Sequence, residues 1–227
     1  MVSALSVSMK NKMLAIYGSG GLGREFLDIA NNINTVSNLW SEIVFINDYE
    51  NGGEILGAKV LSFESIMKNK DTYEIIIAIG EPSLREELFY KAKSNGLKIA
   101  TLIDPTARVS SSAIIGEGSV LCEYSSIHCS VKIGKNCLIQ PYSLLGHDII
   151  VGSHSVFSAH SSLGGASVFG DRVYVGMHAT IKEKLTIGDD AIISMGSTVF
   201  RDVAARSVVI GNPARVTKGN DEGKVFL

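Results

Sequence analysis

Apolar residues recur at every sixth position through the C-terminal half of the chain, without insertion or deletion. A period of six matches neither an amphipathic helix nor a two-faced strand. It predicts a short strand followed by a tight corner, repeated so that three sides close one triangular coil of eighteen residues. Such a parallel β-helix buries the apolar residues of each coil against its neighbours. The sixteen positions are Val109, Ile115, Leu121, Ile127, Ile133, Ile139, Leu145, Val151, Phe157, Leu163, Phe169, Val175, Ile181, Ile187, Ile193 and Val199.

Two further features share this period. The residue two before each apolar position is often small, as in Ser119, Cys137 and Ser155, and is expected to make room beside the axis. The residue just after it is Gly in eight of the sixteen repeats. We expect these glycines to supply corner conformations that a Cβ would hinder. The pattern assigns residues 104–216 to the β-helix. After Val199 the column fails, because Ala205 and Gly211 hold the next two positions. A polar tail over 217–227 follows, part of which is expected to cap the last coil.

The N-terminal half shows a different pattern, in which apolar runs alternate with segments of helical periodicity. Strands alternating with helices predict a parallel sheet of Rossmann-like type, here over residues 12–103. The leader, 1–12, is expected to be a disordered extension. The expected elements are strands at Met13–Ile16, Glu42–Ile46, Tyr73–Ile79 and Leu97–Ile103, and helices at Arg24–Ile33, Ser62–Met67 and Pro82–Lys93.

A glycine-rich turn joins the first strand to the first helix. Gly18, Gly20 and Gly23 satisfy the pattern G-x-G-x-x-G in the required context. Such glycines let backbone N–H groups approach a phosphate at a helix N-terminus. Asp48 ends the second strand, where it is placed to bind a nucleoside hydroxyl or ring N–H. The motif alone favours NAD, but four strands are only half of a dinucleotide fold, so a nucleoside diphosphate is preferred. A turn needed only for close helix–sheet packing is the third interpretation.

Composition narrows the range of partners. The formal net charge is −2, which gives no reason to expect a nucleic-acid or anionic membrane partner. No apolar run approaches the roughly 18 residues that span a bilayer, and the leader lacks the pattern of a signal peptide. Three cysteines without a CxxC pair indicate reduced thiols and a cytoplasmic protein. Cys137, at a small inward position, is expected to be a packing residue.

His147 is the strongest candidate for chemistry. It lies two residues past an apolar position, at a corner, with Asp148 beside it, and Gly165 lies one coil further along. Coils stack at the roughly 4.8 Å strand spacing, so the imidazole and the Gly165 backbone should be neighbours. A neutral imidazole is a suitable general base near pH 7, and a backbone N–H can hold an oxyanion. The alternative is an inert surface histidine.

A second pair of histidines raises a metal alternative. His160 and His178 are eighteen residues apart and should stack on one corner. His154 falls on a different edge of the prism. Catalytic zinc needs about three protein ligands, which one chain does not supply here. A solvated corner pair is therefore preferred, and no metal is expected.

Together, the glycine-rich α/β half and the hexapeptide half resemble the bacterial nucleotide-sugar N-acetyltransferases of the hexapeptide-repeat family. Relatives of this layout include the UDP-4-amino-sugar acetyltransferases and the sialic-acid O-acetyltransferases. The resemblance implies a left-handed β-helix, a homotrimer and acetyl-CoA lying between adjacent β-helices. It also implies a nucleotide-sugar substrate bound by the N-terminal domain.

The resemblance also assigns residue roles by position. It implies that His147 is the catalytic base, assisted by Asp148, and that the N–H of Gly165 contacts the thioester carbonyl. Two departures from the family pattern are Val156, which occupies the slot of a second, cofactor-contacting histidine, and Asn47, where an aspartate is frequent. The remaining implied contacts are Met177 and Met195 for acetyl-CoA, and Gly18, Gly20, Gly21, Leu22, Asn47, Asp48 and Gly80 for the nucleotide sugar.

The sequence therefore predicts transfer of an acetyl group from acetyl-CoA to the amine of a nucleotide-linked amino-deoxysugar. Three alternatives stay open at this point: O-acetylation of a sialic acid or related sugar, a metal-dependent hydratase, and a nucleotide-binding scaffold without catalysis. The departure at Asn47 leaves the identity of the nucleobase open.

Overall fold

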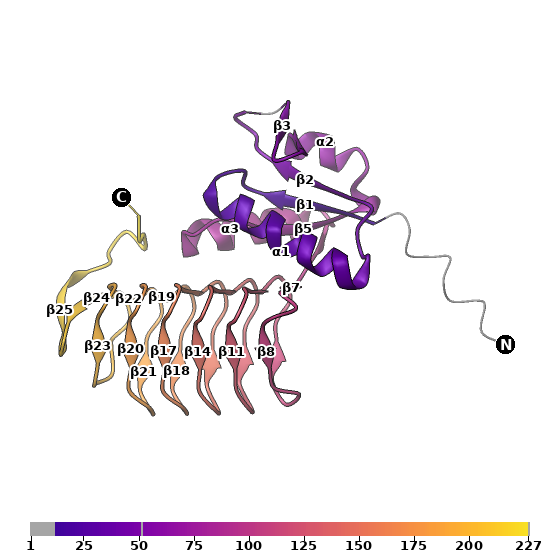
Figure 1. The fold of residues 1–227 in the computed structure, drawn as a ribbon. Helices are drawn as coiled ribbons and strands as arrows, with labels where there is room; N and C mark the ends of the chain where they lie inside the picture. The colour runs from indigo at the N-terminus through magenta and orange to yellow at the C-terminus, as the bar shows by residue number, and fades with distance from the viewer. Residues whose placement is uncertain (1–11, 51, 227) are drawn as a thin grey trace. The chain divides into compact units, whose positions relative to one another are not determined.

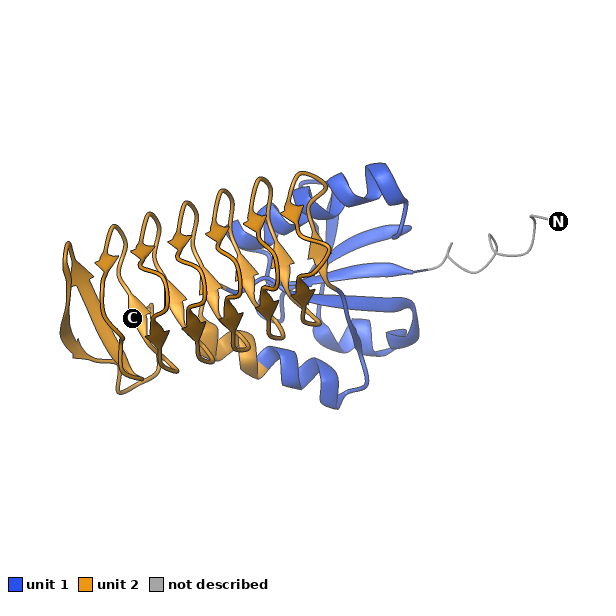
Figure 2. Cartoon of the chain, turned by 90° about the horizontal axis from the view of Figure 1, so that it is seen from below, with its two compact units in different colours: residues 1–79, 88–100 blue, residues 80–87, 101–227 orange. Residues whose placement is uncertain are grey.

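A computed structural model describes residues 12–50 and 52–226 of the chain. The expectation for the leader falls on residues outside this range, apart from Lys12. Figure 2 shows two compact units, residues 1–79 with 88–100 and residues 80–87 with 101–227. The division differs from the predicted boundary after residue 103, because residues 80–87 and 101–103 belong to the second unit.

The first unit contains a twisted sheet in the strand order β3-β4-β2-β1-β5-β6. Neighbouring strands are parallel except for the β3–β4 hairpin. The chain leaves β1 toward β2 on one side, while β5 lies on the other side, which makes the carboxyl ends of β1 and β5 a topological switch point. The strands are β1 (Met13–Tyr17), β2 (Glu42–Ile46), β3 (Glu54–Ile55), β4 (Ala58–Leu61), β5 (Tyr73–Ile77) and β6 (Lys98–Ile99).

Helices pack against this sheet (Figure 1). Helix α1 (Gly21–Ser37) buries Phe26, Ile29, Ala30 and Ile33, at the spacing of one helical face. Helix α2 (Phe63–Met67), the 3₁₀ turn η1 (Lys70–Thr72) and helix α3 (Pro82–Ser94) follow. A hydrophobic cluster joins α2 and α3 to Tyr17, Val44 and the middle of β5.

Two sequence predictions in this half need correction. Strand β4 was not expected, because its four residues bury only Ala58 and Val60 between a glycine-rich loop and a helix. The single strand predicted over Leu97–Ile103 is two: β6 pairs with β5, whereas β7 (Leu102–Ile103) pairs with β10 as the first rung of the β-helix. Ala100 and Thr101 interrupt the strand, and the chain passes there from one sheet to another.

The second unit is the predicted left-handed parallel β-helix, which is confirmed. Rungs of two residues pair with rungs eighteen residues later and form three faces (Figure 1). Within the described residues, face 1 consists of β7 (Leu102–Ile103), β10 (Val120–Leu121), β13 (Leu138–Ile139), β16 (Val156–Phe157), β19 (Tyr174–Val175), β22 (Ile192–Ile193), β24 (Ser207–Gly211) and β25 (Ala214–Gly219). Face 2 consists of β8 (Arg108–Val109), β11 (Ser126–Ile127), β14 (Leu144–Leu145), β17 (Ser162–Leu163), β20 (Thr180–Ile181) and β23 (Thr198–Val199). Face 3 consists of β9 (Ile114–Ile115), β12 (Lys132–Ile133), β15 (Ile150–Val151), β18 (Val168–Phe169) and β21 (Thr186–Ile187).

The axis is filled as the period predicted. From Leu121 to Val199 each residue of the apolar column is at most 3% exposed, and the small residues Ser125, Ser143 and Ala179 are fully buried. Each column residue stacks on its equivalent one coil away, so every coil is stabilised by the hydrophobic effect only through its neighbours.

The corner glycines serve a different purpose from the one predicted. A Cβ on Gly176 would lie 2.5 Å from the backbone nitrogen of Met195 in the next coil, and one on Gly116 would overlap the backbone of Gly134. The left-handed backbone conformation falls two residues later and is adopted by side-chain-bearing residues such as His178, with φ 56°. Glycine is therefore needed for the close approach of coils, not for an unusual φ.

The column also continues after Val199, contrary to the sequence interpretation. Val203 and Val209 are 5% and 3% exposed and pair with Ile187 and Ile193, sixteen residues earlier. The corner after Val199 is shorter by two residues, which shifts the register and hides the repeat. Strand β24 then turns back into the antiparallel strand β25, which closes the edge of face 1.

The described end of the tail folds back on the second unit. The N–H groups of Val225 and Phe226 donate to one carboxylate oxygen of Glu81, at 2.9 and 3.0 Å. The Phe226 ring packs edge-on against Tyr174, with centroids 5.5 Å apart.

Candidate active site

The glycine-rich turn follows the last residue of β1. Gly20 caps helix α1 in an extended conformation, and no side chain caps the helix. The first N–H groups of α1 are therefore available to an anion at the positive end of the helix dipole. Gly20 and Gly21 are exposed.

The glycines of the motif divide into two kinds. Gly18 has φ 115°, and a Cβ there would lie 2.8 Å from the carbonyl oxygen of Ala78. A Cβ on Gly23 would overlap the carbonyl of Gly18. A Cβ on Gly20 would meet nothing within 4 Å, and one on Gly21 only the tip of Arg24. Packing therefore requires glycine at positions 18 and 23, while the open backbone at 20 and 21 is what a phosphate needs.

Asn47 braces this turn against the loop after β2. Its amide nitrogen donates to the hydroxyl of Ser19 at 2.9 Å, and its carbonyl oxygen accepts the N–H groups of Tyr49 and Glu50. These bonds fix the amide orientation at the carboxyl ends of β1 and β2.

Asp48, the second predicted nucleoside contact, already accepts several bonds. Its carboxylate accepts the Phe63 N–H at 2.8 Å and the Tyr17 hydroxyl at 2.7 Å, and the Lys91 ammonium lies 3.5 Å away. Partial burial raises the pKa of this carboxyl, but those three partners outweigh it and leave the pKa below its usual value. Oδ1 accepts only the Phe63 N–H among these partners and retains one further lone pair for a nucleoside hydroxyl.

Lys91 is a member of this cluster that the sequence analysis did not single out. Its ammonium donates to the Tyr17 hydroxyl at 2.7 Å and lies 4.4 Å from the centre of the Phe63 ring. On a charged helix such as α3 no spacing signal distinguishes this lysine from its exposed neighbours.

The imidazole of His147 lies at the corner between faces 2 and 3. A Cβ on Gly165 would be 2.7 Å from its Nε2, so the ring edge lies against the backbone of the next coil. The backbone nitrogen of Gly165 is 2.8 Å from where a Cβ of Gly146 would stand, on the side of the coil that carries His147. The predicted neighbours are therefore in contact.

Asp148 orients this imidazole. Its carboxylate lies 2.8 Å from His147 Nδ1, and both side chains are about 60% exposed, at 62% and 59%. Because an ionised carboxylate only accepts, Nδ1 carries the proton and the Nε2 lone pair is free beside Gly165. This is the tautomer that a general base requires.

The predicted acetyl-CoA contacts are not gathered around His147 within one chain. Met177 and Met195 are exposed at the corner between faces 1 and 2, a different edge of the prism. Val156 lies on face 1 and is 2% exposed. The predicted contact of Val156 with acetyl-CoA stays a prediction. Gly80 follows β5, and a Cβ there would lie 3.6 Å from the Phe226 ring.

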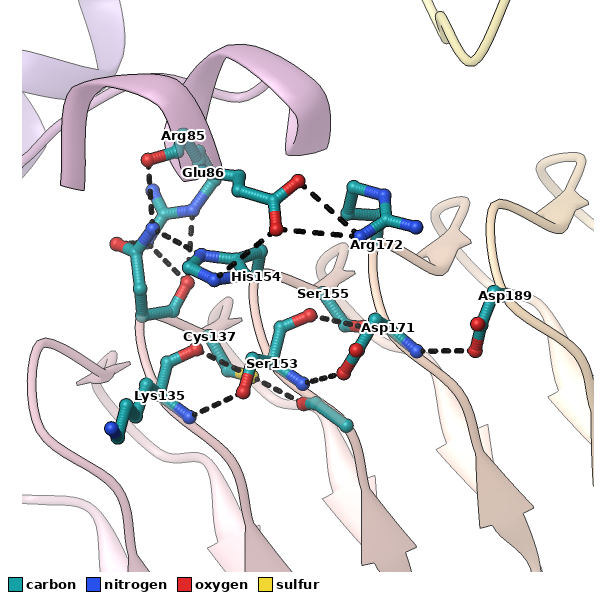
Figure 3. A network of polar contacts seen from close by, with 12 residues as sticks. Arg85, Glu86, Lys135, Cys137, Ser153, His154, Ser155, Asp171, Arg172 and Asp189 are labelled. Carbon is teal, nitrogen blue, oxygen red and sulfur yellow. Dashed lines mark hydrogen bonds and ion pairs between the residues drawn. The ribbon is translucent and has the colours of Figure 1, made fainter. Parts of the chain in front are cut away.

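His154 belongs to a buried polar cluster that the sequence analysis missed (Figure 3). It is 2% exposed, with Nδ1 2.9 Å from the amide nitrogen of Asn136, one coil earlier. The fully buried Arg85 donates to the Asn136 backbone and side-chain oxygens at 3.0 Å. Burial and then the charge of Arg85 lower the pKa of His154 to about 4, so its ring is neutral. Asn136 and His154 are eighteen residues apart, one full coil, and this spacing could have predicted that their side chains are neighbours.

The geometry of His160 and His178 disfavours the metal alternative. Their rings stack face to face, with centroids 4.8 Å apart and planes inclined by 3°. Parallel rings direct their nitrogen lone pairs side by side, so the two do not converge on one ion. In the part of the chain that the structure describes, no group of three or more His, Cys, Asp or Glu side chains is placed to hold a metal.

Cys137 is buried as expected, and its thiol donates to the carbonyl of Gly152 at 3.0 Å. Burial raises the pKa of this thiol to about 12, so it is not a nucleophile. Among residues 12–50 and 52–226, no helix has the length and apolar character to cross a bilayer.

Comparison with known proteins adds independent findings. Residues 13–92 match the family model of the PglD N-terminal domain, and residues 130–165 match that of the bacterial transferase hexapeptide repeat. WeeI from Acinetobacter baumannii is 30% identical; the match covers 91% of this chain and all of that one, with a TM-score of 0.85.

Two further solved structures are similar over nearly the whole chain. The acetyltransferase domain of PglB from Neisseria gonorrhoeae, in complex with acetyl coenzyme A, is 26% identical with a TM-score of 0.86, over 91% of this chain and 100% of that one. PerB from Caulobacter crescentus, in complex with CoA and GDP-perosamine, is 26% identical with a TM-score of 0.81, over 90% and 97%.

Proposed function

Because this chain belongs to the hexapeptide-repeat nucleotide-sugar acetyltransferases with a PglD-type N-terminal domain, we propose that it acetylates the amine of a nucleotide-linked amino-deoxysugar, with acetyl-CoA as donor. The observation that carries the reaction is the contact of His147 with Gly165, together with the Asp148 carboxylate on Nδ1. Acetyl-CoA in the PglB domain and GDP-perosamine in PerB support the two substrates.

In the proposed reaction, the amine nitrogen of the sugar attacks the thioester carbonyl while His147 Nε2 accepts its proton. The N–H of Gly165 stabilises the oxyanion of the tetrahedral intermediate, a contribution of about 3 kcal/mol for one donor. The C–N bond forms, the C–S bond breaks, and the imidazolium returns the proton to the departing CoA thiolate. Asp148 stabilises the imidazolium formed in between.

The N-terminal unit holds the nucleotide part in this proposal. The open backbone of Gly20, Gly21 and Leu22, at the N-terminus of α1, binds the diphosphate, while Asn47 and Asp48 contact the nucleoside. Gly80, which follows β5, lets the nucleotide sugar approach the backbone closely. The uncapped helix and the room at Gly20 support this assignment over a purely structural glycine turn.

The acetyl-CoA contacts imply more than one copy of the chain. Met177 and Met195 lie on a different edge of the prism from His147, so one chain does not gather them at one site. We therefore assign acetyl-CoA to the groove between adjacent β-helices of a homotrimer, with His147 from one copy and the methionine edge from another.

The decisive experiment compares wild type with His147→Ala in steady-state acetylation of a panel of UDP-, dTDP-, GDP- and CMP-linked amino sugars. The expected result is a fall in kcat of at least about a hundredfold with unchanged nucleotide-sugar affinity. Near-normal turnover of the variant would remove His147 from the mechanism. The same panel with hydroxyl in place of amino acceptors separates this activity from O-acetylation of a sialic acid.

A further inference from the structure

Four aromatic rings form a continuous stack along the corner between faces 1 and 2. Tyr124, Tyr142, His160 and His178 occupy the same position in successive coils. Their ring centroids are 5.1, 4.9 and 4.8 Å apart, and the ring planes are inclined by 20°, 4° and 3°. The two tyrosines are about half exposed, so the stack lies on the outside of the prism.

The next position of this column is Gly196, and the stack stops there. Its backbone keeps the register, since the Gly196 N–H donates to Met177 O at 2.8 Å, just as the His178 N–H donates to Ala159 O. Its φ is 68°, close to the 56° and 60° of His178 and His160. A Cβ on Gly196 would meet nothing within 4 Å. One coil is therefore present without its ring, and residue 196 supplies no side chain to cover the outer face of His178.

The surroundings of this gap suit a flat ligand. Met177 and Met195, 46% and 68% exposed, flank it, and methionine packs adaptably against aromatic rings. The pairing of Ile193 with Val209 places the β24–β25 turn one coil beyond Gly196. Pro213 of that turn and the adjacent Arg215 line a cavity of about 370 Å³, together with Arg201 and Asp202 of the next corner, and the charge of Arg215 suits a phosphate group.

We propose that the open face of His178 above Gly196 binds the adenine ring of acetyl-CoA, which takes the place of the missing fifth ring. This inference rests on the proposed function, because it concerns the donor of that reaction. Stacking of a base on an aromatic side chain is typically worth about tenfold in affinity or more. A ring joined to phosphates fits a gap that has Arg215 beyond it, and the nucleobase of the sugar substrate has its own proposed contacts in the N-terminal unit.

Three variants and two acetyl donors test the proposal. Gly196→His closes the gap with the chain's own ring, at a φ that histidine already adopts twice in this column. His178→Asn removes the ring under the ligand while keeping a residue that tolerates the left-handed conformation. Tyr124→Asn removes the ring at the far end of the stack and is the matched control. The donors are acetyl-CoA and S-acetylpantetheine, which lacks the adenosine and its phosphates.

The expected result is a rise of about tenfold in KM for acetyl-CoA in both Gly196→His and His178→Asn, with KM for S-acetylpantetheine unchanged. Tyr124→Asn keeps both KM values. An unchanged KM for acetyl-CoA in Gly196→His and His178→Asn overturns the proposal. An equal rise in KM for both donors also overturns it. If Gly196→His does not fold, His178→Asn carries the test alone. A wild type that turns over neither donor refutes the proposed function itself, which separates that failure from failure of the adenine site.

Discussion

The edge of the His147 imidazole lies against the backbone of Gly165, so close that a Cβ at position 165 would be 2.7 Å from Nε2. The two residues are eighteen apart in sequence, one full coil. A nitrogen able to accept a proton and an amide able to hold an oxyanion are thereby fixed by the same stacking that fills the axis. In the proposed reaction, the fold itself therefore brings the base and the oxyanion donor together.

Gly165→Ala tests this relationship. The added methyl group displaces the imidazole from its present position, and a shift of about 1 Å costs on the order of a hundredfold in rate. We expect kcat to fall by about that factor while the melting temperature stays close to that of wild type, because the corner is exposed. Ala166→Ser, at the next residue of the same corner, is the control and should keep its activity. Wild-type turnover in Gly165→Ala would show that this contact does not set the rate.

Gly20→Ala and Gly23→Ala separate ligand binding from packing in the glycine-rich turn. Position 20 has room for a Cβ, so we expect normal stability and a loss of about tenfold in nucleotide-sugar affinity as the methyl group blocks the phosphate. Position 23 has no room, so the free energy of unfolding should fall by about 1–3 kcal/mol. Thermal unfolding and titration of each variant give both quantities. If Gly20→Ala bound the nucleotide sugar as tightly as wild type, the glycine-rich turn would serve only helix–sheet packing.

His154 predicts an acid-dependent loss of stability. Its pKa is about 4 in the folded chain, against about 6.5 unfolded, so the unfolded state binds more protons between these values. Stability is therefore complete above pH 6.5 and falls by about 2–3 kcal/mol as the pH drops to 4. Around this ring lie the cations Arg85, Arg172 and Lys135 and the carboxylates Glu86 and Asp171.

Chemical denaturation between pH 7 and 4 measures this loss. His154→Gln retains an acceptor for Asn136 and should show a shallower slope, whereas His128→Gln, which alters an exposed histidine, should keep the slope of wild type. If the unfolding free energies of His154→Gln and wild type fell in parallel with pH, the acid sensitivity would belong to other groups.

Asp48 predicts a linkage of the same sign at lower pH, because its pKa is also lower in the folded chain than in the unfolded one. Its folded pKa lies below the usual value, so its contribution is complete above the unfolded pKa, near 3.9, and is lost as the pH falls through the lower folded value. Because the carboxylate is about a third exposed, the contribution should be below about 1 kcal/mol. The difference in unfolding free energy between wild type and Asp48→Asn should shrink toward zero below that range. A difference that persists at the acid end would point to packing instead of charge.

The sequence was sufficient wherever residues interact at a fixed spacing. The period of six gave the β-helix and its axis, and the spacing of eighteen placed His147 beside Gly165 and stacked His160 on His178. It failed at Val203 and Val209, because a corner shorter by two residues moves the column out of phase while its physical role continues.

Other features depend on tertiary contacts that do not follow a repeating spacing in the sequence. Lys91 and Arg85 lie on the same charged helix, yet one joins the Asp48 cluster and the other is fully buried against Asn136. Which lysine or arginine of α3 finds a partner depends on the tertiary packing of that helix. The corner glycines were located correctly but explained wrongly, because a clash with the next coil is invisible in a single repeat.

Helix α3 has a consequence for dissecting the protein. Its first turns, with Arg85 and Glu86, count among the residues of the β-helical unit, and its last turns among those of the sheet. A gene fragment starting at residue 104 would thus omit the arginine that satisfies Asn136 and would leave His154 without its cover. No single cut of the chain yields two intact halves, so the two units have to be expressed together.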